Sequence, residues 1–141
     1  MNPTSQGTAK YLETQILTAS PEQLVVLMYN GALRFLGEAK AAMEAHDIPR
    51  QADRIHRAQK ILMRLMSTLN LELGGEIASN LLALYMHFFD KLTDASINDD
   101  ATALAFVYDQ MRVLRDAFQE AERTARTENA VRVQTGGRSA G

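Results

Sequence analysis

Two acid–histidine pairs are the residues of this chain whose types and spacing could bind a metal ion. Asp53 precedes His56 by three residues and Asp90 follows His87 by three, a separation that places each pair on one face of a helix. Metal-dependent enzymes built on helix bundles bind their ions with glutamates and Glu-x-x-His pairs that face the interior of the bundle. On the other predicted helices, the residues expected to face the bundle interior are methionine, phenylalanine, valine and leucine, which offer no metal ligands. A metal-dependent bundle enzyme therefore stays a remote alternative, and we expect no metal and no cofactor.

Other catalytic signatures are missing from the sequence. The chain has no cysteine, which excludes a thiol nucleophile and a cysteine-ligated zinc site. It has no Gly-x-Ser-x-Gly segment, and Gly74-Gly75 lacks the Lys-Ser/Thr that follows a phosphate-binding loop. We therefore expect that the protein is not an enzyme.

Length and charge limit the remaining classes. The 141 residues suffice for one domain, and the formal net charge of -2 disfavours a nucleic-acid-binding protein. The sequence contains no secretory signal and no apolar run long enough to span a membrane. These features predict a cytoplasmic protein that binds neither nucleic acid nor membrane.

The helices that would position any site can be placed from caps and apolar spacing. Ser20 before Pro21 is a typical helix start, and Gln23 completes a capping box. Asp47 is the expected cap of the next helix. Apolar residues recur every three or four positions in four segments, which are about 21–45, 48–72, 76–96 and 100–126.

Short connections between these segments predict an all-α fold, an antiparallel up-down-up-down four-helix bundle over residues 20–127. Residues 1–19 form a short N-terminal cap segment with one apolar cluster. Residues 128–141 lack apolar anchors and are predicted to be a disordered tail.

The second and third of these helices carry more apolar residues than one seam requires. Either the extra residues widen the core, or they line an apolar groove for an amphipathic helix of a partner. Methionine favours the groove, because it is flexible enough to repack around a guest. The candidate groove residues are Met63, Met66, Leu82, Tyr85, Met86 and Phe89.

Three ordered blocks of the sequence resemble the flagellar export chaperones of the FliS family. The first runs from Tyr11 through Gln15-Ile16-Leu17-Thr18-Ala19-Ser20-Pro21-Glu22-Gln23 to Leu36, the second is Leu71–Tyr85, and the third is Ala95-x-Ile97-x-Asp99/Asp100. The resemblance extends from about Tyr11 to Glu122. Asn30 departs from it, because the family commonly has aspartate there.

The resemblance implies a chaperone that binds the C-terminal segment of flagellin in the cytoplasm, prevents premature polymerisation, and aids delivery to the flagellar type III export gate. It also implies that Tyr11, Ile16 and Leu17 form the cap segment over the groove. The alternative is a helical adaptor or regulatory protein that forms a homodimer, or binds another flagellar partner, through the same groove.

Overall fold

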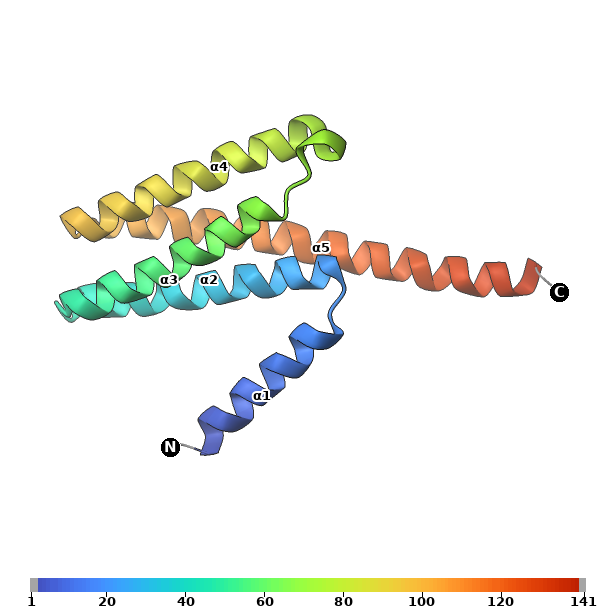
Figure 1. Ribbon diagram of the computed structural model, residues 1–141, viewed down its shortest axis with the longest axis horizontal. Helices are drawn as coiled ribbons and strands as arrows, with labels where there is room; N and C mark the ends of the chain where they lie inside the picture. Colours follow the sequence, from blue (N-terminus) through green and yellow to red (C-terminus); the bar gives the residue numbers. More distant parts are fainter. Residues whose placement is uncertain (1–2, 140–141) are drawn as a thin grey trace. The chain divides into compact units, whose positions relative to one another are not determined.

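The computed structural model describes residues 3–139, and within that range it contains five helices and no strand (Figure 1). The all-α class predicted from the sequence is confirmed. None of the described helices has the length and apolar composition that a bilayer span requires. The helices are α1 (Pro3–Thr18), α2 (Pro21–Glu44), α3 (Ile48–Ser67), α4 (Leu71–Asn98) and α5 (Ala101–Ser139).

The count of five differs from the predicted four-helix bundle with a short N-terminal cap segment and a disordered C-terminal tail. The expected cap segment forms α1, in which the hydroxyls of Thr14 and Thr18 bond to the carbonyls of Lys10 and Thr14. Likewise, α5 continues through residues 128–139, where a disordered tail was predicted. The stretch from 128 to 134 contains no proline or glycine, so nothing in its composition terminates a helix.

The chain divides into two compact units, which are described separately. The central unit comprises Met28–Leu114, and the terminal unit combines the chain before Met28 with the chain after Leu114. Nearly all the apolar side chains that are buried belong to the central unit. They include Tyr29, Leu36, Ile55, Ala58, Leu62, Leu65, Tyr85, Phe88, Leu92, Leu104, Val107 and Met111.

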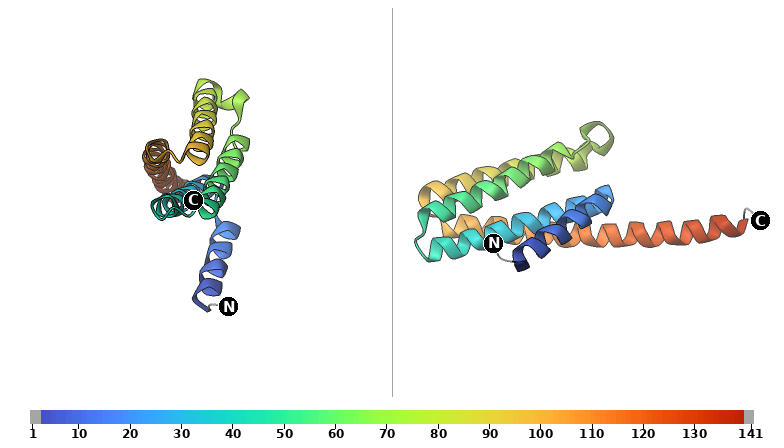
Figure 2. Two further views of the ribbon diagram at one scale, coloured as in Figure 1. Left: turned by 90° about the vertical axis from the view of Figure 1, so that its left-hand side faces the viewer. Right: turned by 60° about the horizontal axis from the view of Figure 1, so that its bottom comes forward.

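Within the central unit α3 and α4 lie side by side (Figure 2). Asp47 caps α3 as predicted, because its carboxylate accepts a hydrogen bond of 3.3 Å from the Arg50 amide. The predicted boundary between the two helices was wrong. The α3 helix ends at Ser67 and not near 72, and Asn70 then starts α4 by accepting a 3.0 Å hydrogen bond from the Leu73 amide.

Gly75 does not separate two elements as expected but kinks α4 near its start. Its backbone angles are φ 53° and ψ -130°, a conformation that is strained for residues with a β-carbon. Beyond the kink, apolar spacing in the sequence places Ile77 on the core side of the helix. Ile77 is 75% exposed, whereas its neighbour Ala78 is buried. The apolar spacing is therefore misleading in the first turn beyond the kink, whereas Phe88 and Leu92, farther along the same spacing, are buried.

Gln51 is a buried polar residue that the apolar spacing of α3 did not indicate. The prediction placed Ala52 on the seam, but Ala52 is exposed and Gln51 is 1% exposed. The Gln51 side-chain amide donates a 2.8 Å hydrogen bond to the carboxylate of Asp99. This bond ties the start of α3 to the turn between α4 and α5, and it offsets part of the cost of burying an amide.

Candidate partner-binding surface

A side-chain amide sets the register between α3 and α4. Nε2 of Gln59 donates to the carbonyl oxygen of Phe89 at 3.1 Å and lies 2.8 Å from the hydroxyl oxygen of Thr93. Both acceptors are on α4, one helical turn apart. The amide thereby fixes which turn of α4 faces the middle of α3.

Helical spacing extends this register to four of the predicted groove residues. Met63 and Met66 follow Gln59 by four and seven residues and therefore lie on the same side of α3. Met86 and Leu82 precede Phe89 by three and seven residues on α4. The two helices run in opposite directions across a short connection (Figure 2). The two rows of residues are therefore expected to follow the same junction.

The exposed fractions show that this junction is open to solvent at its methionines. Met63 is 58% exposed and Met86 is 53% exposed, whereas Met66, Leu82 and Phe89 are half-buried. We call these five residues the α3–α4 face. Its half-buried members support the core, as one of the two interpretations of the sequence predicts, and its exposed members are accessible to a partner. The groove for a partner helix stays a prediction.

Tyr85 does not belong to that face, and its assignment to the groove is corrected. Its side chain is 1% exposed and its hydroxyl shares a hydrogen bond of 2.5 Å with the hydroxyl of Tyr29, which is also buried. Burial raises the pKa of both phenols, and the mutual hydrogen bond raises the pKa of Tyr29 further. A phenol at this position can be buried because its one polar group has a partner.

The predicted cap residues lie on α1, in the terminal unit. Tyr11, Ile16 and Leu17 are 66%, 53% and 77% exposed, and the adjacent Leu12 is 40% exposed. Exposed apolar residues in such a cluster commonly mark an interaction site. Their expected role as a cover for the groove stays a prediction.

The connection from α1 to α2 has the geometry of a capping box, as predicted. The Ser20 hydroxyl accepts a 3.2 Å hydrogen bond from the Gln23 amide, and the Gln23 side chain accepts one of 3.0 Å from the Ser20 amide. Nε2 of Gln23 also lies 3.3 Å from a carboxylate oxygen of Glu122 on α5. The start of α2 is thus held both by its own cap and by the last helix.

Comparison with known proteins identifies the family to which these features belong. The sequence profile described as "Flagellar protein FliS" matches residues 4–125, which span α1, the capping box and the α3–α4 face. The chain belongs to the FliS family. The part of α5 beyond residue 125 lies outside the match.

Curated relatives in the FliS family align with most of the chain. The flagellar secretion chaperone FliS of Bacillus subtilis is 32% identical over 116 residues, covering 82% of this chain and 86% of the relative. That of Vibrio cholerae is 33% identical over 109 residues, covering 77% and 80%. The flagellar secretion chaperone FliSB of Pseudomonas aeruginosa is 36% identical over 93 residues, covering 66% and 74%. These three names describe chaperones, not a class of enzyme.

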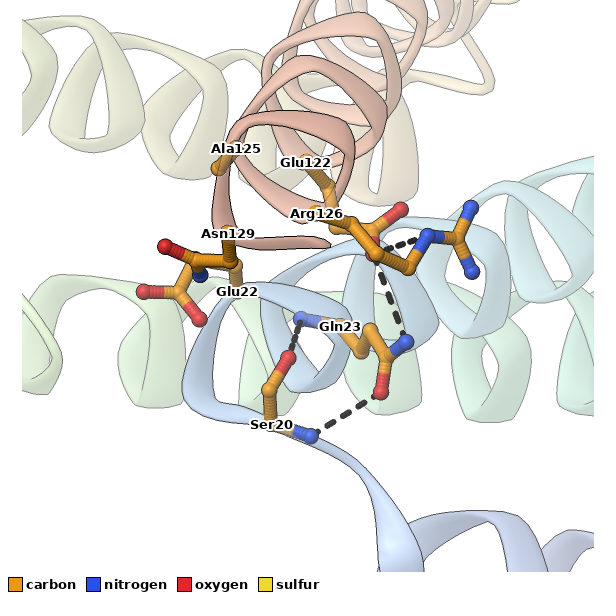
Figure 3. Close-up of a pocket in the computed structure, with 7 residues that line it drawn as sticks. All are labelled: Ser20, Glu22, Gln23, Glu122, Ala125, Arg126 and Asn129. Atoms are coloured by element: carbon orange, nitrogen blue, oxygen red, sulfur yellow. Dashed lines mark hydrogen bonds and ion pairs between the residues drawn. The ribbon is translucent and has the colours of Figure 1, made fainter. Parts of the chain in front are cut away.

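A polar pocket of about 260 Å³ lies beside the capping box in the terminal unit (Figure 3). Its centre is organised by Glu122, whose carboxylate lies 3.5 Å from the Arg126 side chain and also meets Gln23. Glu122 thus joins the amide of Gln23 and the guanidinium of Arg126 within this pocket. The lining residues are Ser20, Glu22, Gln23, Glu122, Ala125, Arg126 and Asn129.

Sequence reasoning missed the exposed apolar residues around the Gly75 kink. Leu71 is 49% exposed and Leu73 is 88% exposed, and Ile77 on the other side of the kink is also largely exposed. The signal was present as the alternation of leucine and glutamate before the glycines. It was interpreted as the end of a helix, because two successive glycines usually terminate one.

The acid–histidine pairs do not assemble into a metal site in residues 3–139, where no group of three or more potential ligands occurs. Asp53 is hydrogen-bonded by the side chains of Arg57, at 2.9 Å, and Arg54. These contacts, with that from Arg57 the largest, hold the pKa of the Asp53 carboxyl below its usual value. His87 instead packs edge-on against the ring of Phe106.

Proposed function

We propose that the protein is a cytoplasmic secretion chaperone that binds the C-terminal segment of flagellin. Family membership supports a role in flagellar export, and the curated relatives are named as secretion chaperones. The observation that carries the proposal is the α3–α4 face, where two methionines are more than half exposed beside half-buried apolar residues.

This face has the chemistry that a chaperone for an aggregation-prone segment requires. Methionine side chains are flexible and polarisable, so they adapt to apolar side chains of different shape. An amphipathic helix of the client would bury its apolar stripe here and could no longer use that stripe to polymerise. Ordering a flexible client segment costs free energy, which lowers the affinity and favours release at the export gate.

The terminal unit supplies the second part of the proposal. In this scheme the four helical stretches of the central unit act as the bundle, and the apolar cluster of α1, formed by Tyr11, Ile16 and Leu17, covers the face only through weak contacts that the client displaces. The exposure of all three side chains supports the availability of this helix for such contacts. The competing scheme is a homodimer in which a second copy occupies the same face.

Calorimetric titration tests the proposal directly. The titrant is a peptide that covers about the last 40 residues of flagellin from the same organism, a length that can supply a standard-sized interface. We expect one-to-one binding with a negative change in heat capacity, because apolar surface is buried. A folded, monomeric protein that does not bind this peptide would exclude flagellin as the client. Mass measurement over a dilution series tests the competing homodimer, which should dissociate into monomers on dilution.

A charge-insertion variant locates the binding surface. Met63→Glu combined with Met86→Glu places two carboxylates on the α3–α4 face at positions exposed enough to leave the fold intact. We expect binding to weaken about 100-fold, because an unpaired charge at an apolar contact costs about 3 kcal/mol.

The matched control carries Ala105→Glu and Val113→Glu, two exposed apolar positions of the central unit that lie on α5 and not on α3 or α4. It should bind like the wild type, and circular dichroism of both variants should show unchanged helical content. Equal losses in the two variants would place the client elsewhere.

A further inference from the structure

The side of α3 turned away from Gln59 packs against α2. Three contacts along this junction define it: Ile61 with Gly31, Arg57 with Phe35, and Arg54 with Glu38. A β-carbon at Gly31 would lie 3.3 Å from the end of the Ile61 side chain. Nε of Arg54 lies 2.7 Å from the Glu38 carboxylate. Along these three contacts the residue numbers decrease on α2 as they increase on α3, so the two helices run antiparallel.

Cations form a row along this side of α3. Arg50, Arg57 and Arg64 are spaced by seven residues, which is two helical turns, so the row is about 21 Å long. Lys60 lies beside the row, between Arg57 and Arg64. Asp53 is the sole acid of α3.

Most of the positive charge in this row is not neutralised. The Asp53 carboxylate is shared by Arg54 and Arg57. Among the ion pairs of residues 3–139, none includes Arg50, Lys60 or Arg64. The three side chains are exposed. This local excess contrasts with the formal net charge of -2 for the whole chain.

An aromatic ring lies beside the cations. The Arg34 guanidinium is 4.7 Å from the centroid of the Phe35 ring, and that of Arg57 is 5.8 Å away. The ring is half-buried, as is Ile61. The surface therefore combines a shallow apolar strip, made by Phe35 and Ile61, with cations on both of its sides. We call it the α2–α3 face.

We propose that the α2–α3 face binds an acidic amphipathic helix of a partner protein, at a site separate from the α3–α4 face. Carboxylates flanking the apolar stripe of such a helix would pair with Arg34, Lys60 and Arg64, while the stripe itself would contact Phe35 and Ile61. A row of about 21 Å matches a helix of about 14 residues. Complementary charge of this kind sets the orientation of a partner and its rate of association.

The composition of the face distinguishes this partner from a lipid surface or a nucleic acid. Binding to a membrane interface requires exposed apolar side chains that enter the acyl region, but Phe35 and Ile61 are half-buried. A nucleic-acid-binding protein normally carries a basic excess over the whole domain, and this chain is acidic overall.

The test uses two designed peptides of about 14 residues that share leucines at helical spacing. One carries glutamate and the other lysine at all remaining positions. Fluorescence anisotropy measures the binding of each to the full chain. We expect binding of the glutamate peptide, weakened by added salt, and none of the lysine peptide. Equal binding of the two peptides would overturn the proposal.

Charge reversal then assigns the binding to the face. Lys60→Glu with Arg64→Glu should weaken binding of the glutamate peptide about tenfold or more, because two attractive charge pairs become repulsive. The matched control, Arg112→Glu with Arg132→Glu, changes the net charge equally at exposed positions on α5 and should stay within about twofold of the wild type. Equal effects of the two variants would show an attraction to net charge alone.

Two further measurements distinguish an acidic helix from other ligands of the α2–α3 face and test whether the two faces are separate. The first measures binding of vesicles with anionic lipid and of single-stranded DNA. If either binds more tightly than the glutamate peptide and is weakened by the same charge reversal, the ligand of this face is a membrane or a nucleic acid and not a protein helix. The Lys60→Glu, Arg64→Glu variant should still bind the flagellin segment as the wild type does. A parallel loss of that segment would show one continuous surface and overturn the separation of the two faces.

Discussion

The central and terminal units differ in how they use apolar side chains. In the central unit, Tyr29, Phe88 and Leu92 are almost completely excluded from solvent. In the terminal unit, Tyr11, Ile16 and Leu17 are more than half exposed. Buried apolar area is the main source of folding free energy. The central unit therefore supplies the stability, while the terminal unit retains apolar surface for contacts made with something else.

The largest effect should follow from removing a core ring. Phe88 is fully buried and packs edge-on against Phe106. Phe88→Ala should lower the free energy of unfolding by about 3–5 kcal/mol, because it loses apolar burial and leaves a cavity. Urea denaturation followed by circular dichroism measures this loss. Ile97→Ala, at an exposed position of the same helix, is the control and should change stability by less than about 0.5 kcal/mol.

The buried tyrosine pair should make the central unit sensitive to alkaline pH. The pKa values of Tyr29 and Tyr85 are raised in the folded state, so folding retains protons that the unfolded chain releases above its pKa of about 10. Stability is therefore complete below about pH 10 and falls as pH rises further, by about 1.4 kcal/mol per pH unit for each tyrosine.

Tyr85→Phe should remove about half of that alkaline slope and cost about 1 kcal/mol at neutral pH through the lost hydrogen bond. Unfolding titrations at several pH values give both quantities. Tyr11→Phe, an exposed position in the terminal unit, serves as the comparison. A slope unchanged in Tyr85→Phe would mean that burial of this phenol does not control the pH response.

A smaller and local effect is expected at the capping box. Ser20→Ala removes the acceptor of the Gln23 amide and should cost about 1 kcal/mol at the start of α2. Hydrogen exchange of the amides from Gln23 onward measures it. Faster exchange there, with an unchanged urea midpoint, would sharpen the contrast between the units. A urea midpoint that falls as far as in Phe88→Ala would show that the start of α2 contributes as much to global stability as the core of the central unit does.

The smallest effect should come from α1. Leu17 is 77% exposed, so Leu17→Ser should change the free energy of unfolding by less than about 0.5 kcal/mol. Differential scanning calorimetry on the free protein tests this. A loss above about 2 kcal/mol would show that Leu17 is buried in the free protein and would remove the distinction drawn between the two units.

The sequence predicted the helices best where polar signals are local. Ser20 with Gln23, and Asp47 before Pro49, mark starts that the structure confirms. Apolar spacing also predicts the buried positions of α3 correctly at Ile55, Ala58, Leu62 and Leu65, because most of the remaining positions of that helix are polar.

Prediction was weaker on α4, and the reason is compositional. Apolar residues occur on most sides of this helix, so spacing alone could not decide that Tyr85 points inward and Ile77 outward. The hydrogen bond between Tyr85 and Tyr29 and the kink at Gly75 decide it. Both depend on residues or backbone angles that periodicity does not encode. Three of the five members of the α3–α4 face, Leu82, Met86 and Phe89, lie on α4, where that ambiguity is greatest.

The tyrosine pair also makes the protein its own optical reporter. The chain has no tryptophan and four tyrosines, so its near-ultraviolet circular dichroism arises chiefly from tyrosine, and Tyr29 and Tyr85 are the two held rigidly in an asymmetric interior. Loss of tertiary packing should abolish that signal while leaving the far-ultraviolet helical signal in place. A client segment without tryptophan or tyrosine could therefore be titrated without a label, and any loosening of the interior would be recorded directly.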